Sequence, residues 1–205
     1  MKNRLGLPTP DGFVITNEAY HQVLAENSLV DRVKTLLQNL NPDKLADITA
    51  QGEEIKEAIR QAAIPTTLRE EVNRHYQKLA ETLGYEPHLA LRSSGIYEDQ
   101  EFSFAGLFLT KLNVPFADIF PAYLEVLASQ FNPRALVYLC QKKLVHREQA
   151  MSVGCLAMVP SVASGVLFTV DPMGRQDNVM LLDASWGLGP AVVDGTVTPD
   201  QFVLA

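Results

Sequence analysis

Apolar residues recur every three or four positions through the first part of the chain, which is the spacing of one face of a helix. The recurring positions form three stripes: Leu29, Val33, Leu36, Leu37 and Leu40; Leu45, Ile48, Ile55 and Ile59; and Val72, Tyr76, Leu79 and Leu83. A short apolar strand, Phe13–Ile15, comes before them. The pattern therefore predicts one strand followed by a region that is helical throughout.

Polar residues and glycines mark where these helices begin and end. Helix starts are predicted at Thr16 or Asn17, at Ser28 with Asp31 in capping-box spacing, and at Thr67 with Glu70. Gly84 stands where a C-terminal glycine cap belongs, and Gly52 predicts an interruption of the second stripe.

From residue 88 onward, short apolar runs alternate with helical stretches. Strands are predicted at His88–Leu91, within Phe104–Val114, and at Met151–Val159, Gly165–Val170 and Val179–Asp183. Helices are predicted at Phe116–Gln130 and, capped by Asn132, at Pro133–Lys143. We therefore predict an α+β protein in two parts, 1–87 mostly helical and 88–205 mixed.

Composition narrows the class of protein. The 205 residues are 47% hydrophobic and carry a formal net charge of −7, which argues against nucleic-acid binding. There is no signal-like segment and no apolar run of membrane-spanning length, so neither secretion nor a membrane is expected. Cys140 and Cys155 have no metal-binding spacing and are expected to be reduced core residues of a cytoplasmic protein. The four histidines form no ligand pair.

Candidate chemistry gathers in five glycine-containing segments of the second part: Arg92–Gly95, Ser103–Gly106, Ser164–Thr169, Trp186–Gly189 and Asp194–Gly195. Each alone could be a turn. Together with Arg92 and Thr169 they offer backbone N–H groups, hydroxyls and a guanidinium, which is what a polyphosphate site needs. The P-loop and dinucleotide-binding glycine motifs are both absent. Glu98 and Asp99 could bind Mg²⁺ or form a solvated turn, and Trp186 is expected to be a packing anchor.

Taken in order, these segments resemble the nucleotide-binding domain of the phosphoenolpyruvate synthase and pyruvate phosphate dikinase family, which includes the rifampin phosphotransferases and has an ATP-grasp-like fold. The matching stretches are Gly6–Thr16, Arg92–Ser94 with Glu98–Asp99, Ser103–Gly106, Leu112–Val114, Met158–Val159, Ser164–Pro172, Trp186–Gly189 and Val197–Asp200. They span nearly the whole chain, and their order makes the resemblance specific.

The resemblance implies a role for each matching residue in binding ATP. Arg92, with Ser93, would hold phosphates; Gly106 would lie in the loop that covers them, and Thr169 would reach them from its strand. Met158 and Val159 would line the adenine hinge, and Gly187 and Gly189 would lie in a nucleotide-contacting loop. The implied reaction phosphorylates a carrier histidine from ATP and passes the phosphate on, with phosphohistidine and pyruvate or phosphoenolpyruvate domains elsewhere in the protein.

Departures from the family pattern leave alternatives open. Leu156 stands where the family has Gln, Pro190 where it has Glu, and Ile96 where Thr is common. The family's phosphate-contacting lysine would precede Met1, and its acidic Mg²⁺ ligand and Gln-x-Arg motif would follow Ala205. We therefore expect a domain truncated at both ends that binds ATP weakly or not at all by itself. The alternatives are a degenerate binding or regulatory module and a phosphotransferase with another acceptor, such as inorganic phosphate or an antibiotic.

Overall fold

The computed structural model describes residues 6–41, 43–95, 107–145, 149–174 and 177–204. By their contacts the residues divide into two compact units, Met1–Met158 and Val159–Ala205. The elements of the first unit, in chain order, are β1 (Gly12–Ile15), α2 (Asn17–Glu26), α3 (Val30–Gln38), α4 (Leu45–Arg60), α5 (Thr66–Leu83), β2 (Leu89–Gly95), β3 (Thr110–Val114), η1 (Phe116–Asp118), α6 (Ile119–Ala128), η2 (Ser129–Phe131), α7 (Pro133–Gln141) and β4 (Met151–Ala157). Those of the second are β5 (Ala163–Phe168), β6 (Met180–Trp186), α8 (Pro190–Val193) and β7 (Asp200–Leu204).

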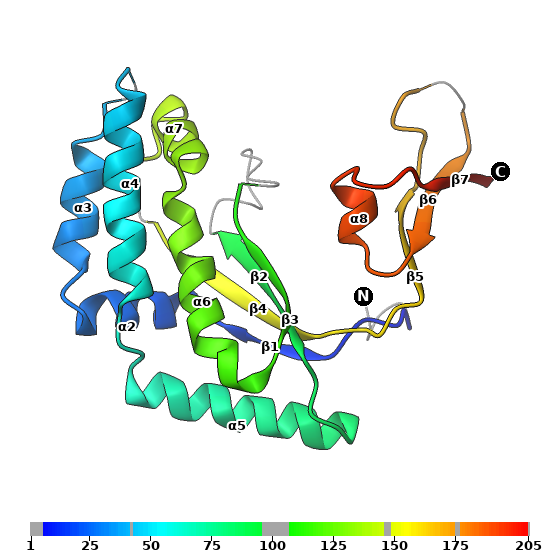
Figure 1. Ribbon diagram of the computed structural model, residues 1–205, viewed down its shortest axis with the longest axis horizontal. Helices are drawn as coiled ribbons and strands as arrows, with labels where there is room; N and C mark the ends of the chain where they lie inside the picture. Colours follow the sequence, from blue (N-terminus) through cyan, green and yellow to red (C-terminus); the bar gives the residue numbers. More distant parts are fainter. Residues whose placement is uncertain (1–5, 42, 96–106, 146–148, 175–176, 205) are drawn as a thin grey trace. The chain divides into compact units, whose positions relative to one another are not determined.

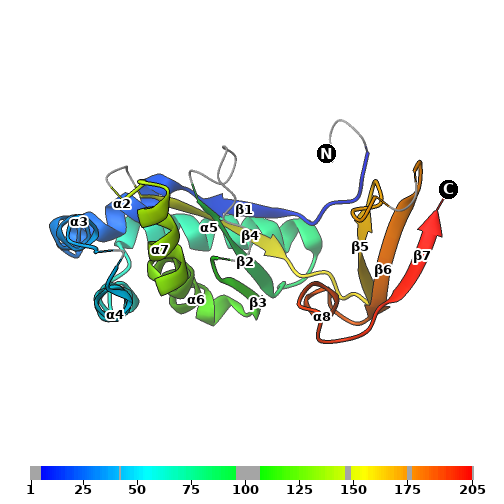
Figure 2. The same ribbon diagram turned by 90° about the horizontal axis from the view of Figure 1, so that it is seen from above.

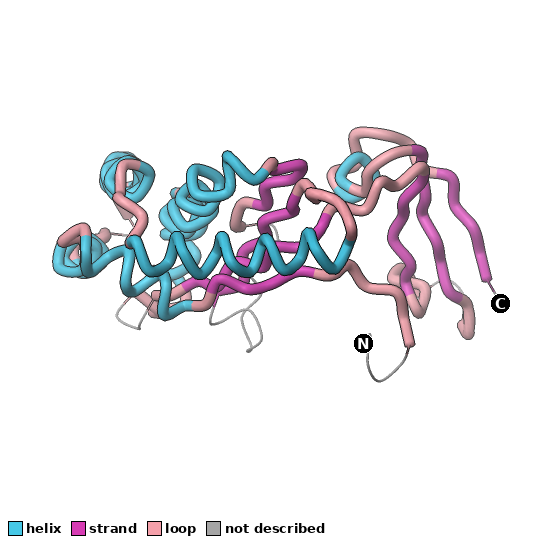
Figure 3. Tube along the Cα trace, turned by 90° about the horizontal axis from the view of Figure 1, so that it is seen from below, coloured by secondary structure: helices cyan, strands magenta, loops and turns pink. Residues whose placement is uncertain are grey.

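The first unit is a four-stranded antiparallel sheet, in the order β1-β4-β2-β3, packed against helices (Figure 1). Helix α5 runs across the strands on one side of the sheet. It lies in front of the strands when seen from below (Figure 3) and behind them when seen from above (Figure 2). Helix α6 packs against β2, β3 and β4, and most of its side chains are buried. An antiparallel sheet with helices against it confirms the predicted α+β class.

The second unit is a three-stranded antiparallel sheet in the order β5-β6-β7, with the short helix α8 packed against β5 and β6. The strands at β5 and β6 were predicted within a few residues. Strand β7 and helix α8 were not predicted, because their residues carry no clear period and follow glycine and proline turns. None of the helices in the described ranges combines the length and apolarity needed to cross a bilayer.

Helix boundaries agree with the sequence at some positions and differ at others. Gly84 ends α5 in the left-handed conformation, with φ of 77°, as predicted. The capping box at Ser28 is wrong: α3 begins at Val30, and Ser28 has a positive φ of 55° in the turn before it. Asp31 still lies in the first turn, where a negative charge favours the helix dipole.

The predicted interruption at Gly52 is also wrong, because α4 is continuous from Leu45 to Arg60. Gly52 is buried where α4 meets η2 and α7. A Cβ built on Gly52 would lie 2.6 Å from the Phe131 carbonyl oxygen and 2.9 Å from the Leu136 Cδ1. The glycine therefore serves helix packing, not a break in the helix.

Strand β2 also differs from the prediction. It was expected to end at Leu91, but its pairing with β4 continues to Gly95, which lies opposite Met151. Arg92 therefore lies within the strand and not at its mouth. The apolar run alone did not reveal this, because the residues after Leu91 become polar where one side of the sheet is uncovered.

Replacing Gly52 with alanine should destabilise the protein by about 1–3 kcal/mol, because the added methyl group overpacks the contact with η2 and α7. The matched change in the same helix, Ala50→Gly at an exposed position, should cost about 1 kcal/mol through helix propensity alone. Urea unfolding of both variants gives the comparison. An increase in stability for Gly52→Ala would contradict the packing role.

Candidate functional site

Helices cover one face of the four-stranded sheet, and within the described ranges no helix covers the other, which we call the open face. Leu89 and Leu91 of β2 and Val153 and Cys155 of β4 have no exposed surface. Since side chains alternate along a strand, the residues between them lie on the other side of the sheet. We define this open face by Val14, Arg92, Ser94, Ser152, Gly154 and Leu156.

Arg92 lies in the middle of the open face. Its Cα is paired with Gly154 of β4 on one side and with Thr110 of β3 on the other, and Gly154 is paired in turn with Val14 of β1. The Arg92 side chain is exposed and forms no ion pair with any residue in the described ranges. An unpaired guanidinium on an open sheet face is available to an anion.

The serines next to Arg92 lie on opposite faces. Ser93 is paired with the buried Val153 and faces the helix-covered side, whereas Ser94 is paired with Ser152 on the open face. Ser94 is thus a candidate that the sequence did not distinguish from Ser93, since only strand register separates adjacent hydroxyls. Gly106, Ile96, Glu98 and Asp99 lie outside the described residues.

The backbone around Met158 leaves two groups free beyond the end of β4. The Met158 N–H donates to the His88 carbonyl at 2.9 Å, and the Val159 carbonyl accepts from the Ser161 N–H at 2.8 Å. Within the described ranges, the Met158 carbonyl and the Val159 N–H have no hydrogen-bond partner. This acceptor and this donor belong to one trans peptide group and therefore point in opposite directions.

Next to this segment, a hydrogen bond between the side chains of His88 and Asn113 stabilises an irregularity in the pairing of β3. The pairing of β2 with β3 shifts between Leu89 and Leu91, and Asn113 has a positive φ of 58°, a conformation that asparagine tolerates better than most residues. The His88 Nδ1 lies 2.8 Å from the Asn113 Oδ1, so this nitrogen carries the hydrogen that is donated. The same His88 thus supports both Asn113 and, through its carbonyl, Met158.

In the second unit, the predicted residues lie at the two ends of β5. Gly187, with φ of 84°, donates its N–H to the Val162 carbonyl at 2.7 Å and accepts from the Ser164 hydroxyl at 2.5 Å. Gly189 caps α8. Thr169 is exposed and follows the other end of the strand. From Ser164 to Thr169 a strand advances roughly 17 Å, so these groups cannot touch the same ligand atom.

Trp186 is not a packing anchor in the described structure. Its side chain is 79% exposed at the end of β6, which corrects the prediction from sequence. Its partner across the strands is the small Ala163. The large indole of Trp186 has little to pack against, because the residue opposite it in the three-stranded sheet is the small Ala163.

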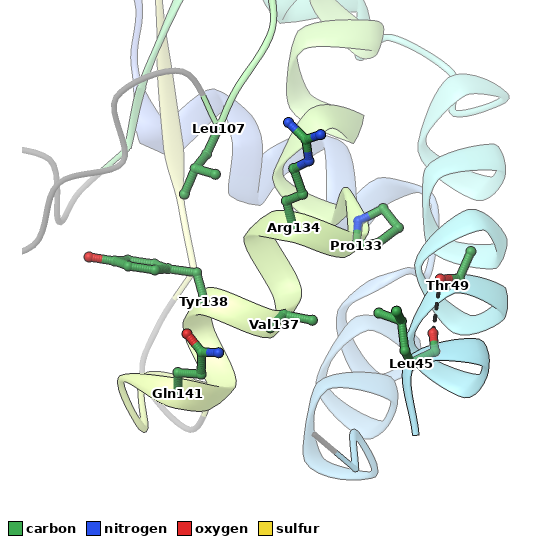
Figure 4. A pocket seen from close by; sticks show the side chains of 8 residues that line it. All are labelled: Leu45, Thr49, Leu107, Pro133, Arg134, Val137, Tyr138 and Gln141. Carbon is green, nitrogen blue, oxygen red and sulfur yellow. Dashed lines mark hydrogen bonds between the residues drawn. The ribbon is translucent and has the colours of Figure 1, made fainter. Parts of the chain in front are cut away.

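One cavity of the first unit lies away from these residues. A cavity of about 430 Å³ lies between α4 and α7, where Leu45 and Val137 point toward one another and Arg134 extends away from them (Figure 4). Its other lining residues are Thr49, Leu107, Pro133, Tyr138 and Gln141. None of the predicted nucleotide-site residues lines it, so an open face and not an enclosed cavity carries the candidate site.

Neither metal chemistry nor thiol chemistry is favoured by the described side chains. No three His, Cys, Asp or Glu residues in the described ranges come together as a metal-binding group. Both cysteines are free, and Cys155 is fully buried, as predicted for a core residue. Burial raises the pKa of the Cys155 thiol to about 12 and also raises the pKa of Cys140. The remaining candidate chemistry is anion binding at Arg92.

Comparison with known proteins identifies the class of domain. The family model of the pyruvate phosphate dikinase AMP/ATP-binding domain matches residues 1–205. The chain belongs to this family. The sheet face that carries Arg92 is thus part of an AMP/ATP-binding domain.

The similar proteins include phosphoenolpyruvate synthases. The chain is 38% identical to the probable phosphoenolpyruvate synthase of Staphylothermus marinus, over 98% of this chain and 25% of that protein. It is also 38% identical to the phosphoenolpyruvate synthase of Aquifex aeolicus, over 98% of this chain and 24% of that protein. The identity to the phosphoenolpyruvate synthase of Neisseria meningitidis is 38% as well, over 96% of this chain and 25% of that protein. The chain thus spans about a quarter of the length of these relatives.

The burial of the two thiols makes a direct prediction. At pH 8 in the native protein, Cys140 should react slowly with a thiol reagent and Cys155 not at all, because the thiolate is the reacting species and its formation is disfavoured by burial. In urea both should react. Labelling followed by peptide mass spectrometry locates the modified residue. Fast native labelling of Cys155 in a Cys140→Ser variant would show that the sheet opens there.

Proposed function

We propose that ATP binds on the open face of the four-stranded sheet, with its phosphates beside Arg92 and its adenine near Met158 and Val159. The observation that carries the proposal is the exposed Arg92 side chain, which has no ion-pair partner in the described chain and lies beside the unhindered Gly154. A guanidinium offers several donors in a planar fork that suits phosphate oxygens.

The backbone groups left free near the end of β4 suit an adenine ring. An adenine amine can donate to the Met158 carbonyl, or a ring nitrogen can accept from the Val159 N–H. These two groups belong to one trans peptide and point in opposite directions, so one edge of the base would use one of them. From Met158 to Gly154 the strand advances about 13 Å. That separation suits a ligand whose base and phosphates bind at different points along one strand, as an extended nucleotide would.

The other assignments are carried by the family resemblance. Gly106 is proposed to contact phosphates from the first unit, and Thr169, Gly187 and Gly189 are proposed nucleotide contacts of the second. The resemblance also implies Ser93, but its side chain faces the helix-covered side, so a hydroxyl contact on the open face is proposed for Ser94 instead. Within the second unit, Gly187 and Thr169 are separated along β5 in the way that a base end and a phosphate end would be. The ATP-grasp-like fold and the division into 1–87 and 88–205 are part of the same proposal.

The proposed reaction is that of a phosphoenolpyruvate synthase or pyruvate phosphate dikinase. ATP would phosphorylate a carrier histidine in another domain, and the phosphate would pass to pyruvate. The contribution of this chain would be positioning and charge neutralisation by Arg92, which dominate phosphoryl transfer. The described residues offer no Mg²⁺ cluster, so the ligands of that ion would come from other residues of the full-length protein.

A second candidate is nucleotide binding without phosphotransfer. It is favoured by Leu156, whose side chain lies on the open face between Gly12 and Ala90, and by Pro190, which occupies the first position of α8. Neither residue can supply the amide or carboxylate that the family pattern has there. An assay for AMP and phosphate formation from ATP separates the two: turnover favours the phosphotransferase, and binding without turnover favours the module.

Arg92→Ala in the full-length protein should abolish most of the thermal stabilisation that Mg-ATP gives, because a ligand protects only the state to which it binds. Loss of one charge-assisted contact typically costs about 2–5 kcal/mol of binding free energy, at least 30-fold in affinity. The stabilisation of Arg92→Lys by Mg-ATP should lie between those of the parent protein and Arg92→Ala, because lysine keeps the positive charge but lacks the planar fork of donors.

Arg134→Ala is the matched control, because Arg134 is an exposed arginine on α7, beside the cavity between α4 and α7 and not on the open face. It should respond to Mg-ATP as the parent protein does. Equal stabilisation of Arg92→Ala and the parent would remove the proposed nucleotide site.

A further inference from the structure

Gly154 occupies an unusual place in the first sheet. It lies in the interior of β4, with β1 on one side and β2 on the other, and its direct neighbours are Val14 and Arg92. Glycine within a strand is unfavourable, because it loses more backbone freedom on folding than other residues and packs no side chain. The presence of glycine at position 154 therefore needs a structural or functional explanation.

The packing of the described residues does not supply that reason. A Cβ built on Gly154 would have one described atom within 4 Å, the Arg92 carbonyl oxygen at 3.8 Å, which is an ordinary contact. Two other strand glycines differ sharply. A Cβ on Gly12 would lie 2.2 Å from the Cys155 carbonyl oxygen, and one on Gly165 would lie 2.4 Å from the Asp183 carbonyl oxygen. Backbone proximity explains Gly12 and Gly165 but not Gly154.

The missing side chain leaves space on the open face next to the guanidinium. Val153 and Cys155 are fully buried on the helix-covered side, so a side chain at 154 would project from the open face. It would stand between the side chains of Val14 and Arg92, directly across from the arginine. Any group that contacts Arg92 from the β4 side would have to occupy the same space.

We propose that Gly154 is a specificity-determining residue that leaves room for a phosphate group of the nucleotide against the strand backbone beside Arg92. The inference rests on the proposed function, because it takes the open face to be the nucleotide face. A phosphate is the part of the ligand that fits there, since its negative charge is complementary to the guanidinium and its tetrahedral oxygens would meet no carbon atom at this position. A β-branched residue at 154 would fill the space.

The test uses Gly154→Ala and Gly154→Val in the full-length protein. Both should keep or raise the thermal midpoint without ligand, because alanine and valine suit a strand better than glycine does. Affinity for Mg-ATP, measured by calorimetry, should fall at least about tenfold for valine and less for alanine. Affinity for adenosine, measured by competition, should stay unchanged because adenosine has no phosphate. Gly12→Ala is the contrasting variant and should lower the midpoint.

Each outcome decides the inference. Unchanged Mg-ATP affinity in Gly154→Val would overturn it. A lowered midpoint in both Gly154 variants, or equal losses of ATP and adenosine affinity, would also overturn it, since the glycine would then serve the fold or the whole site. Failure of the parent protein to bind Mg-ATP is a different result, because it would reject the proposed function itself.

Discussion

The register between β2 and β4 is the constraint on which the rest of the first unit depends. Seven consecutive residues of each strand pair without a break, from Leu89 opposite Ala157 to Gly95 opposite Met151. Because side chains alternate, this register sends one apolar set toward α6 and leaves Arg92 across from Gly154 on the uncovered side. A shift by one residue would exchange the two faces, burying the guanidinium and exposing the leucines, so core packing fixes the position of the arginine.

The helices make that register costly to change. Ile119, Tyr123 and Val126 of α6 have no exposed surface, and fully burying such side chains contributes about 1.5–3 kcal/mol each. Burial also has a cost, since the hydroxyl groups of Tyr20 and Tyr123 have no hydrogen-bond partner in the described structure and the pKa of each is raised by loss of water. The well-packed helices against β2 thus fix the backbone position of Arg92, although the Arg92 side chain is exposed.

The sequence predicted the elements whose signals are local. The stripe of α5 and its Gly84 cap are examples, because helix periodicity and a left-handed glycine depend on few distant contacts. Features that depend on tertiary contact were misread: Gly52 was taken for a break, although its role is set by Phe131 on another element. Without the strand register, the sequence likewise could not show to which face of the sheet Ser93 points. The role proposed for Arg92 rests on the order of the motifs along the chain. Gly154 carried no sequence signal, because an isolated glycine in a strand predicts a bulge as readily as an open space.

The departure at Leu156 affects the two ends of the proposed ligand unequally. Leu156 lies on the open face two residues from Met158, where we propose that the base binds, whereas Arg92 and Gly154 lie further along, where we propose that the phosphates bind. A leucine in place of an amide removes a hydrogen-bonding side chain and leaves apolar surface, on which a ring can still pack. Recognition of the base would then depend on one of the backbone groups of the Met158–Val159 peptide, which no side-chain substitution removes. In the proposed binding mode, Leu156 would reduce selectivity among bases more than affinity for the phosphates, so this replacement is compatible with a domain that still binds nucleoside triphosphates.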